Sequence, residues 1–485
     1  MRLNFPVVLS IMGLLLIINS LAMLLSLSIS IAYGEEAWKP MVYAAGITLF
    51  AGAILRLVYR KFDNKDIRKR EGYLIVTMGW LVLTLSGTLP YLFSGTTETF
   101  ADAFFETMSG YTTTGATILT DIEIQSKTIL FWRSLTHWIG GMGIIVLTIA
   151  ILPLLGIGGM QLFSAEASGP TPAKLHPRIK ETAKRLWIIY VALTGLETVL
   201  LMLGEMTFFD AVNHSMSTMA TGGFSTKNAS LAFYSSPYIQ YVVLVFMFLG
   251  GTSFPLIYFG LRGKLLKVFH NEEFRAYLFA CMAGIVLTTT AILVVTDLPL
   301  ERAFRDAAFQ IVSIITTTGF ITADYTAWAP FVTVLFFVLF FTGASTGSTS
   351  GGIKMMRHVI LIKNSVLEFK RQVHPSAIIP VRFNGKAVTQ NISYHISAFI
   401  LLYLLIFFAG SLVMAAIGLD FESAIGSVAA SLGNIGPAIG SVGPASNFAH
   451  IPAEGKWFLS FLMLLGRLEI FTVLILLTPY FWRRH

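Results

Sequence analysis

The sequence predicts an all-α integral membrane protein in which two N-terminal transmembrane helices precede four parallel repeats, each a helix, a re-entrant loop and a second helix. Three observations predict this fold class. Of the 485 residues, 55% are hydrophobic and 12% are charged, a composition typical of multi-span membrane proteins. Several apolar runs are long enough to cross a hydrocarbon layer of about 30 Å. One short pattern, an acidic residue followed about a dozen positions later by a glycine, occurs four times between such runs.

The first two apolar runs, 6–33 and about 40–60, stand outside the repeats because they carry no glycine loop. The first is too long for the apolar region of a signal peptide and lacks a clear cleavage site, so we expect a retained span. We therefore assign residues 1–71 to an N-terminal helix pair. The repeats are expected at 72–165, 166–262, 263–386 and 387–485.

The net charge of +8 comes from basic clusters that alternate with nearly neutral or acidic connections. This alternation is the positive-inside pattern, which predicts that both termini and the basic loops are cytoplasmic and that the glycine loops face outside. The same distribution argues against a nucleic-acid partner. The single cysteine, Cys281, lies in an apolar run, so neither a disulfide framework nor a thiolate metal site is expected.

Each repeated pattern opens with an aromatic and an acidic residue, which we interpret as the start of a short half-helix. A carboxylate there meets the free N–H groups and the positive end of the helix dipole, so the negative end points inward, where a cation would lie. Each repeat crosses the membrane twice, so all four share one orientation, unlike inverted repeats. The half-helices are expected to begin at Phe100, Phe208, Phe304 and Phe421, and the acidic residues Asp102, Asp210, Asp306 and Glu422 precede the glycines by 13, 12, 13 and 14 residues.

The segments at these glycines are candidate ion-binding elements. A cation that leaves water needs oxygens in place of its hydration shell, and a ring of backbone carbonyls supplies them. Aiming carbonyls at an axis requires backbone dihedrals that glycine adopts freely. The alternative is four tight turns, which need neither the half-helix nor the depth. The candidate filter residues are Thr113, Thr114 and Gly115, Thr221 and Gly222, Thr318 and Gly319, and Asn434, Ile435 and Gly436.

The second span of the third repeat is interrupted. The apolar run 331–341 has 11 residues, about 16 Å of helix, which is too short to cross. A Gly/Ser/Thr stretch follows, and at membrane depth its backbone must face protein or water. We interpret it as a gating loop beneath the filter, with a static kink as the alternative. We expect the second half of the span, residues 353–369, to emerge into the cytoplasm. The candidate gate residues are Gly343, Ser345, Thr346, Gly347, Ser348, Gly351 and Gly352.

Arg467 lies within the last apolar run, 457–477, about ten residues from either end. A charge at that depth costs several kcal/mol unless it has a partner or water. We hypothesise that Arg467 faces the ion path and forms a positive constriction. The alternative is a buried ion pair with a distant carboxylate, because Glu469, two residues on, lies on a different helix face.

Together, the four span–loop–span units, the four single glycines, the interrupted span and the buried arginine resemble the Trk/Ktr/HKT superfamily of potassium transporters. The extra N-terminal pair is most similar to the bacterial Trk-type membrane subunit. The resemblance covers essentially the whole chain. It implies a potassium path in each protomer, a homodimer, a cytosolic nucleotide-binding regulatory subunit, and the bacterial inner membrane. The fourth segment departs from the pattern, since Asn434 and Ile435 precede its glycine, which predicts a chemically asymmetric pore. Each repeat offers only one strictly placed glycine, so we expect weaker discrimination among K⁺, Rb⁺ and Na⁺ than in a tetrameric channel with a longer filter.

We therefore expect potassium uptake through a channel-like pore. The alternative is a carrier-type secondary transporter that couples potassium movement to protons or sodium. An enzyme is not expected, since the G-x-S-x-G match at 343–347 lacks the strand–turn–helix context that this motif requires, and no cofactor is implied. The basic stretch 354–386 suits either an acidic partner or anionic lipid headgroups.

Overall fold

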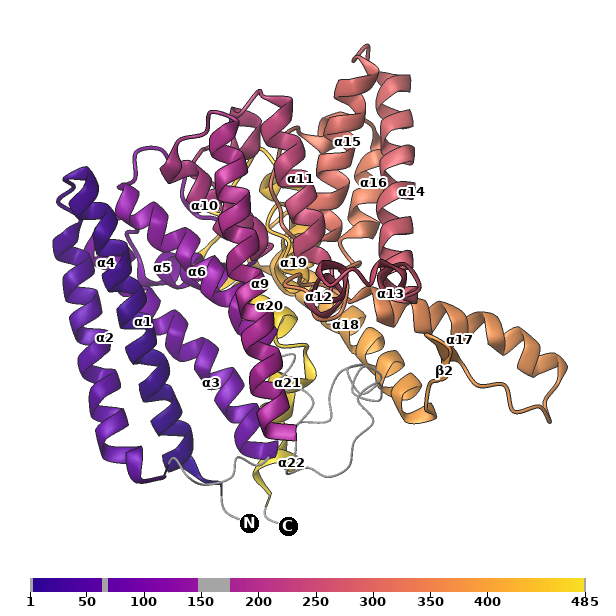
Figure 1. Ribbon diagram of the computed structural model, residues 1–485, viewed down its shortest axis with the longest axis horizontal. Coiled ribbons are helices and arrows are strands. Elements are labelled where there is room, and N and C mark those ends of the chain that lie inside the picture. Colours follow the sequence, from indigo (N-terminus) through magenta and orange to yellow (C-terminus); the bar gives the residue numbers. More distant parts are fainter. Residues whose placement is uncertain (1–2, 63–68, 147–174, 484–485) are drawn as a thin grey trace.

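The two N-terminal helices, α1 (Phe5–Tyr33) and α2 (Trp38–Tyr59), stand side by side at one edge of the computed structural model (Figure 1). The structure describes residues 3–62, 69–146 and 175–483. A Cβ on Gly13 would lie 2.9 Å from the carbonyl oxygen of Gly52, and the reverse distance is also 2.9 Å. Paired glycines thus let the two backbones approach closely. A short 3₁₀ turn, η1 (Arg60–Phe62), follows α2.

Four units with the predicted order of elements follow, which confirms the predicted fold class. Each contains a first span, a half-helix and a second span. The first unit has α3 (Lys69–Gly87), α4 (Leu89–Phe93), α5 (Phe100–Tyr111) and α6 (Lys127–Val146). The second has α9 (Leu175–Leu203), α10 (Phe208–Met219), η4 (Ser230–Phe233), α11 (Pro237–Gly251) and α12 (Phe254–Leu261). The third has α13 (Leu265–Phe269), α14 (Glu272–Val295), α15 (Leu300–Ile315), η5 (Tyr325–Ala327), α16 (Pro330–Leu339) and α17 (Met355–Val373). The fourth has α18 (Gln390–Ile417), α19 (Phe421–Gly433), η6 (Gly440–Val442), α20 (Ala453–Arg467), α21 (Phe471–Leu477) and α22 (Pro479–Trp482).

By length and composition, six helices of the described residues can cross a membrane, or eight if each of two bent pairs forms one span. The bent pairs show that the second spans of the second and fourth repeats are interrupted as well. Helices α11 and α12 meet at 110°, and α20 and α21 meet at 119°. The last apolar run is therefore not one continuous helix.

Three of the four half-helices begin where the sequence predicts, because each has a capping side chain. The hydroxyls of Thr99 and Thr207 accept from the N–H groups of Asp102 and Asp210, both at 3.1 Å. A carboxylate oxygen of Asp420 accepts from the Ser423 N–H at 3.2 Å. This bond and the Ser423 hydroxyl hold the pKa of Asp420 below its ordinary value. The third half-helix differs, since α15 begins at Leu300 after Pro299, one turn before the predicted Phe304.

Helix α17 extends away from the bundle, and a hairpin of β1 (Arg382–Phe383) and β2 (Lys386–Ala387) connects it to α18 (Figure 1). The strands are antiparallel, with Arg382 opposite Ala387. The proposed repeat boundary at 386/387 thus falls inside β2, and the one at 71/72 falls inside the first turn of α3. The boundary at 165/166 lies outside the described residues. The division into repeats at these positions stays a prediction.

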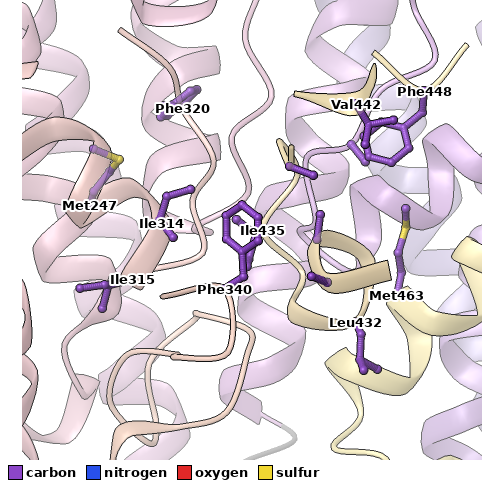
Figure 2. Packing of buried hydrophobic residues seen from close by; sticks show 14 of the residues in the cluster. Met247, Ile314, Ile315, Phe320, Phe340, Leu432, Ile435, Val442, Phe448 and Met463 are labelled. Carbon is purple, nitrogen blue, oxygen red and sulfur yellow. The ribbon is translucent and has the colours of Figure 1, made fainter. Parts of the chain in front are cut away.

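One apolar core runs through all four repeats. Figure 2 shows part of it, including Ile435 from the fourth glycine segment and Phe340 from the end of α16. Both are fully buried. The glycine segments are therefore anchored in the interior of the bundle and do not lie on its surface.

Candidate ion pathway

All four half-helices end in the same backbone geometry. A left-handed residue follows each of them, with φ of 52°, 53°, 56° and 53° at Thr113, Thr221, Thr317 and Asn434. It is the second residue after the helix in the first three repeats and the first residue after it in the fourth. In the first repeat, the Thr113 N–H donates to the Gly110 carbonyl at 3.0 Å and the Thr114 N–H to the Ser109 carbonyl at 2.9 Å. This is the Schellman arrangement, which usually has glycine at the left-handed position. A β-branched residue there is strained, and such strain collects at functional sites.

Two residues after each left-handed residue comes a glycine that also has positive φ. These glycines are Gly115, Gly223, Gly319 and Gly436, with φ of 81°, 79°, 80° and 96°. In the second repeat the structure thus places Gly223, and not the predicted Gly222, at the shared position. A signal for this register was available. Gly223 follows Asp210 by 13 residues, the same spacing as in the first and third repeats.

The four glycines and the residues before them form a closed ring. A Cβ on any of these glycines would collide with the carbonyl oxygen of a neighbouring repeat, so only glycine permits the approach. The order of contacts passes from the first repeat to the second, third, fourth and back to the first. The distances from the added Cβ are 2.1 Å from Gly115 to Gly222 O, 2.0 Å from Gly223 to Thr318 O, 2.1 Å from Gly319 to Ile435 O and 2.7 Å from Gly436 to Thr114 O. The structure thus brings together residues of all four predicted filter segments.

A cavity of about 80 Å³ adjoins this ring. All four glycines line it, together with residues that follow them in the chain. Two basic side chains, Arg133 and Lys227, also contribute to its wall. The ring therefore opens on a space that can hold several water molecules and that residues of every repeat line.

His137 explains why the second repeat has two glycines in succession. Its ring would lie 2.4 Å from a Cβ at Gly222, and it stacks on Phe224 with ring centroids 4.0 Å apart. The imidazole thus takes the space that a side chain fills at the equivalent Thr114 and Thr318. Sequence reasoning did not assign His137 this packing role.

A substitution pair tests this packing. Gly222→Ala should overpack the site, at a cost of about 1–3 kcal/mol, and reduce potassium uptake. Adding His137→Ala to the same chain should restore uptake, because it removes the colliding ring. Uptake of ⁸⁶Rb⁺ by cells with matched amounts of transporter measures both effects, with His137→Ala alone as the control. Equal loss in the single Gly222→Ala and the double variant would contradict this packing.

The Gly/Ser/Thr stretch between α16 and α17 lies buried against the inner ends of the half-helices. The Gly351 N–H donates to the Thr317 hydroxyl at 2.7 Å. The Thr349 hydroxyl donates to the last carbonyl of α10, that of Met219, at 2.9 Å. The Ser345 N–H donates to the Gly251 carbonyl at 3.0 Å, at the bend between α11 and α12. The stretch thus contacts the filter segment of its own repeat and the second repeat below its glycines.

Two buried charges secure this stretch. A carboxylate oxygen of Glu273 accepts from the Thr346 N–H at 2.6 Å and from the Met356 N–H at 3.1 Å. The Lys354 ammonium donates to the carbonyl of Ser350. Lys354 is buried. The expectation that the segment 353–369 emerges into the cytoplasm stays a prediction.

Arg467 is the last residue of α20, at the bend, and its side chain is 2% exposed. Its guanidinium donates to the Thr349 carbonyl at 2.7 Å and to the Gly140 carbonyl at 3.1 Å. The expected alternative, a buried ion pair, is not found for Arg467 among the described residues. Glu469 pairs instead with Arg357 at 2.5 Å. Arg467 therefore joins the Gly/Ser/Thr stretch to α6 of the first repeat.

Four repeats whose half-helices meet in a ring of carbonyls define a fold class, that of helical membrane proteins built from pore-loop repeats. A family model for TrkH, described as cation transport protein, matches residues 40–483. The Trk system potassium uptake protein TrkH of Halomonas elongata is 40% identical over 484 residues, which cover 99% of this chain and 100% of the relative. TrkG of Escherichia coli K12, also named a Trk system potassium uptake protein, is 34% identical over 97% of both chains.

The crystal structure of the potassium transporter TrkH from Vibrio parahaemolyticus superposes with a TM-score of 0.92 at 39% identity, over 99% of this chain and all of the other. The chain belongs to the TrkH family of cation transport proteins. This confirms the predicted family, and it confirms the prediction that the protein is a transporter and not an enzyme.

Proposed function

We propose that the protein takes up potassium through a channel-like path in which the carbonyls of Thr114, Gly222, Thr318 and Ile435 replace the hydration shell of the ion. The observation that carries this proposal is the closed ring of glycine-to-carbonyl approaches. Carbonyl rings of this kind select cations. The names of the relatives, which are potassium uptake proteins, support potassium as the transported ion. No cofactor is part of the proposal.

The ring is chemically uneven, and we expect imperfect selectivity for that reason. Glycine stands in the second repeat where threonine stands in the first and third, and isoleucine stands in the fourth. The Asn434 amide also donates to the Thr114 hydroxyl at 3.0 Å, which ties the fourth segment to the first in a way that the other repeats do not share. Carbonyl sites of unequal geometry discriminate weakly among K⁺, Rb⁺ and Na⁺.

The stretch 343–352 and Arg467 are proposed as the gate. The stretch lies directly below the half-helix ends. Its backbone is bonded to the second repeat and to Arg467, and the Thr349 hydroxyl also bonds to the second repeat. A positive charge held there opposes a cation that leaves the filter. Opening would require these hydrogen bonds to break together.

Several expectations about localisation and partners stay predictions. They are the bacterial inner membrane, cytoplasmic termini, the homodimer, the cytosolic nucleotide-binding subunit and lipid contacts of the basic stretch 354–386.

Current measurements test the proposed function. In planar bilayers that contain the purified protein, a gradient of a potassium salt with no other metal cation present should give currents that reverse close to the potassium Nernst potential. The control is protein-free bilayers of the same lipid. Saturable potassium uptake that depends on a proton or sodium gradient and carries no such current would support the carrier alternative and contradict the pore.

A further inference from the structure

A buried ion pair lies directly behind the ring. Glu106 belongs to α5 and Arg133 to α6, and their side chains are 0% and 2% exposed. The Arg133 Nε lies 2.6 Å from a Glu106 carboxylate oxygen. Both belong to the first repeat, yet their remaining contacts reach the glycine segments of two repeats.

Glu106 holds the outer part of the first glycine segment. Its carboxylate accepts from the Thr117 hydroxyl at 2.9 Å and from the Ile118 N–H at 2.9 Å. These residues lie two and three positions after Gly115. Two bonds to one carboxylate fix the direction in which the backbone leaves the ring.

Arg133 holds the matching part of the second glycine segment. Its guanidinium donates to the Ser225 carbonyl at 3.0 Å and lies 3.4 Å from the centroid of the Phe224 ring. Phe224 and Ser225 directly follow Gly223. The ion pair therefore links the outer parts of the first and second segments across the boundary between the repeats.

In the second and third repeats, the residue equivalent to Glu106 also contacts the glycine segment of its own repeat. It lies seven residues before the left-handed residue, where the second and third repeats have His214 and Gln310. The His214 Nε2 is 2.9 Å from the Ser225 hydroxyl, and the Gln310 side chain contacts Thr322 at 3.3 Å. Each thus braces its own outer segment with a neutral polar contact. In the fourth repeat, the Ser427 hydroxyl donates within its own helix, to the Ala424 carbonyl.

The charge of Glu106 has a second consequence, because Arg133 lines the cavity beside the ring. An unpaired guanidinium there would repel an arriving cation, and its field would act through a poorly screened interior. We propose that Glu106 and Arg133 are a positioning pair that fixes the first and second segments around the ring and neutralises the arginine, and so sets potassium affinity and ion discrimination. This inference rests on the proposed function.

Charge-neutralising variants in proteoliposomes test the pair. Glu106→Gln keeps the shape but leaves Arg133 unpaired, so the guanidinium should repel the arriving cation. The KM for K⁺ should rise about tenfold, which corresponds to about 1.4 kcal/mol of binding free energy. The ratio of Na⁺ to K⁺ transport should change as well. The double variant Glu106→Gln/Arg133→Met removes both charges and should recover part of the KM. Glu368→Gln, which breaks an exposed pair with Arg371 on α17, is the matched control.

Transport is expressed per folded transporter molecule, so that loss of protein is separated from loss of positioning. A normal KM and normal Na⁺/K⁺ ratio in folded Glu106→Gln would overturn the inference. So would reduced total uptake that follows protein amount alone. Gly223→Ala, measured in parallel, separates the two proposals. If Gly223→Ala transports normally, the proposed function is wrong. If Gly223→Ala is inactive while Glu106→Gln transports normally, the proposed function stands and the proposal of a positioning pair is wrong.

Discussion

Gly223→Ala is expected to abolish potassium uptake, although Gly223 is not the glycine that the Thr-Gly pattern selects. The residue has φ of 79°, a conformation that costs an L-residue about 1–2 kcal/mol. The added Cβ would lie 2.0 Å from the Thr318 carbonyl oxygen, so that carbonyl must move. Displacing a positioned group by about 1 Å costs on the order of a hundredfold in rate. Growth at limiting potassium of cells that lack other uptake systems, together with ⁸⁶Rb⁺ uptake, measures the effect.

The chain offers matched controls for this substitution. Gly46 in α2 and Gly195 in α9 also lie in apolar helices, but a Cβ at either meets nothing within 4 Å. Alanine at these positions should leave uptake unchanged. Normal uptake by Gly223→Ala at normal protein amounts would show that the Thr318 carbonyl does not serve the ion.

Arg467→Ala is expected to raise potassium flux by about tenfold, which corresponds to a barrier lowered by about 1.4 kcal/mol. The substitution removes the buried charge and both of its hydrogen bonds, to Thr349 and to Gly140. The Gly/Ser/Thr stretch then loses its tie to the first repeat. Currents per protein molecule in planar bilayers, and the open probability of single channels, report the change.

Arg467→Lys separates the charge from the hydrogen bonds. A lysine keeps the positive charge but lacks the planar fork that reaches two carbonyls at once. If the charge forms the barrier, the lysine variant stays at the low flux of the unaltered protein. If the hydrogen bonds hold the gate closed, both variants conduct more. Lower flux in a well-folded Arg467→Ala protein would rule out a gating role.

Much of the fold follows from local patterns. The lengths of the apolar runs predict α1 and α2, and the aromatic and acidic residues at the start of each repeated pattern predict where α5, α10 and α19 begin. The shortness of the run at 331–341 predicts the interruption after α16. These features depend on helix length, on capping and on the need to satisfy backbone groups in lipid. Residues that are close together in the sequence determine all three.

The bends of the second and fourth repeats were not predicted because long-range contacts set them. No run of Gly, Ser or Thr marks the bend at α20, where Ile470 is left-handed with φ of 47°. Arg467 and Glu469 at this bend bond to residues more than a hundred positions away. Only a folded chain brings these partners together.

The register of the second glycine segment was missed for a different reason. Matching the pair Thr221-Gly222 to Thr114-Gly115 relied on residue identity, whereas the left-handed position repeats by distance from the half-helix start. His137 makes the difference, since its ring occupies the side-chain space at Gly222. A packing partner from another helix is not visible in a local motif.

The position of a bound ion tests the central claim most directly. The anomalous signal of Rb⁺ or Tl⁺ in crystals of the protein should give a peak on the axis of the ring, within coordination distance of the carbonyl oxygens of Thr114, Gly222, Thr318 and Ile435. Competition with K⁺ should remove the peak. Ordered heavy-ion density elsewhere in the bundle, with none at this ring, would contradict the account.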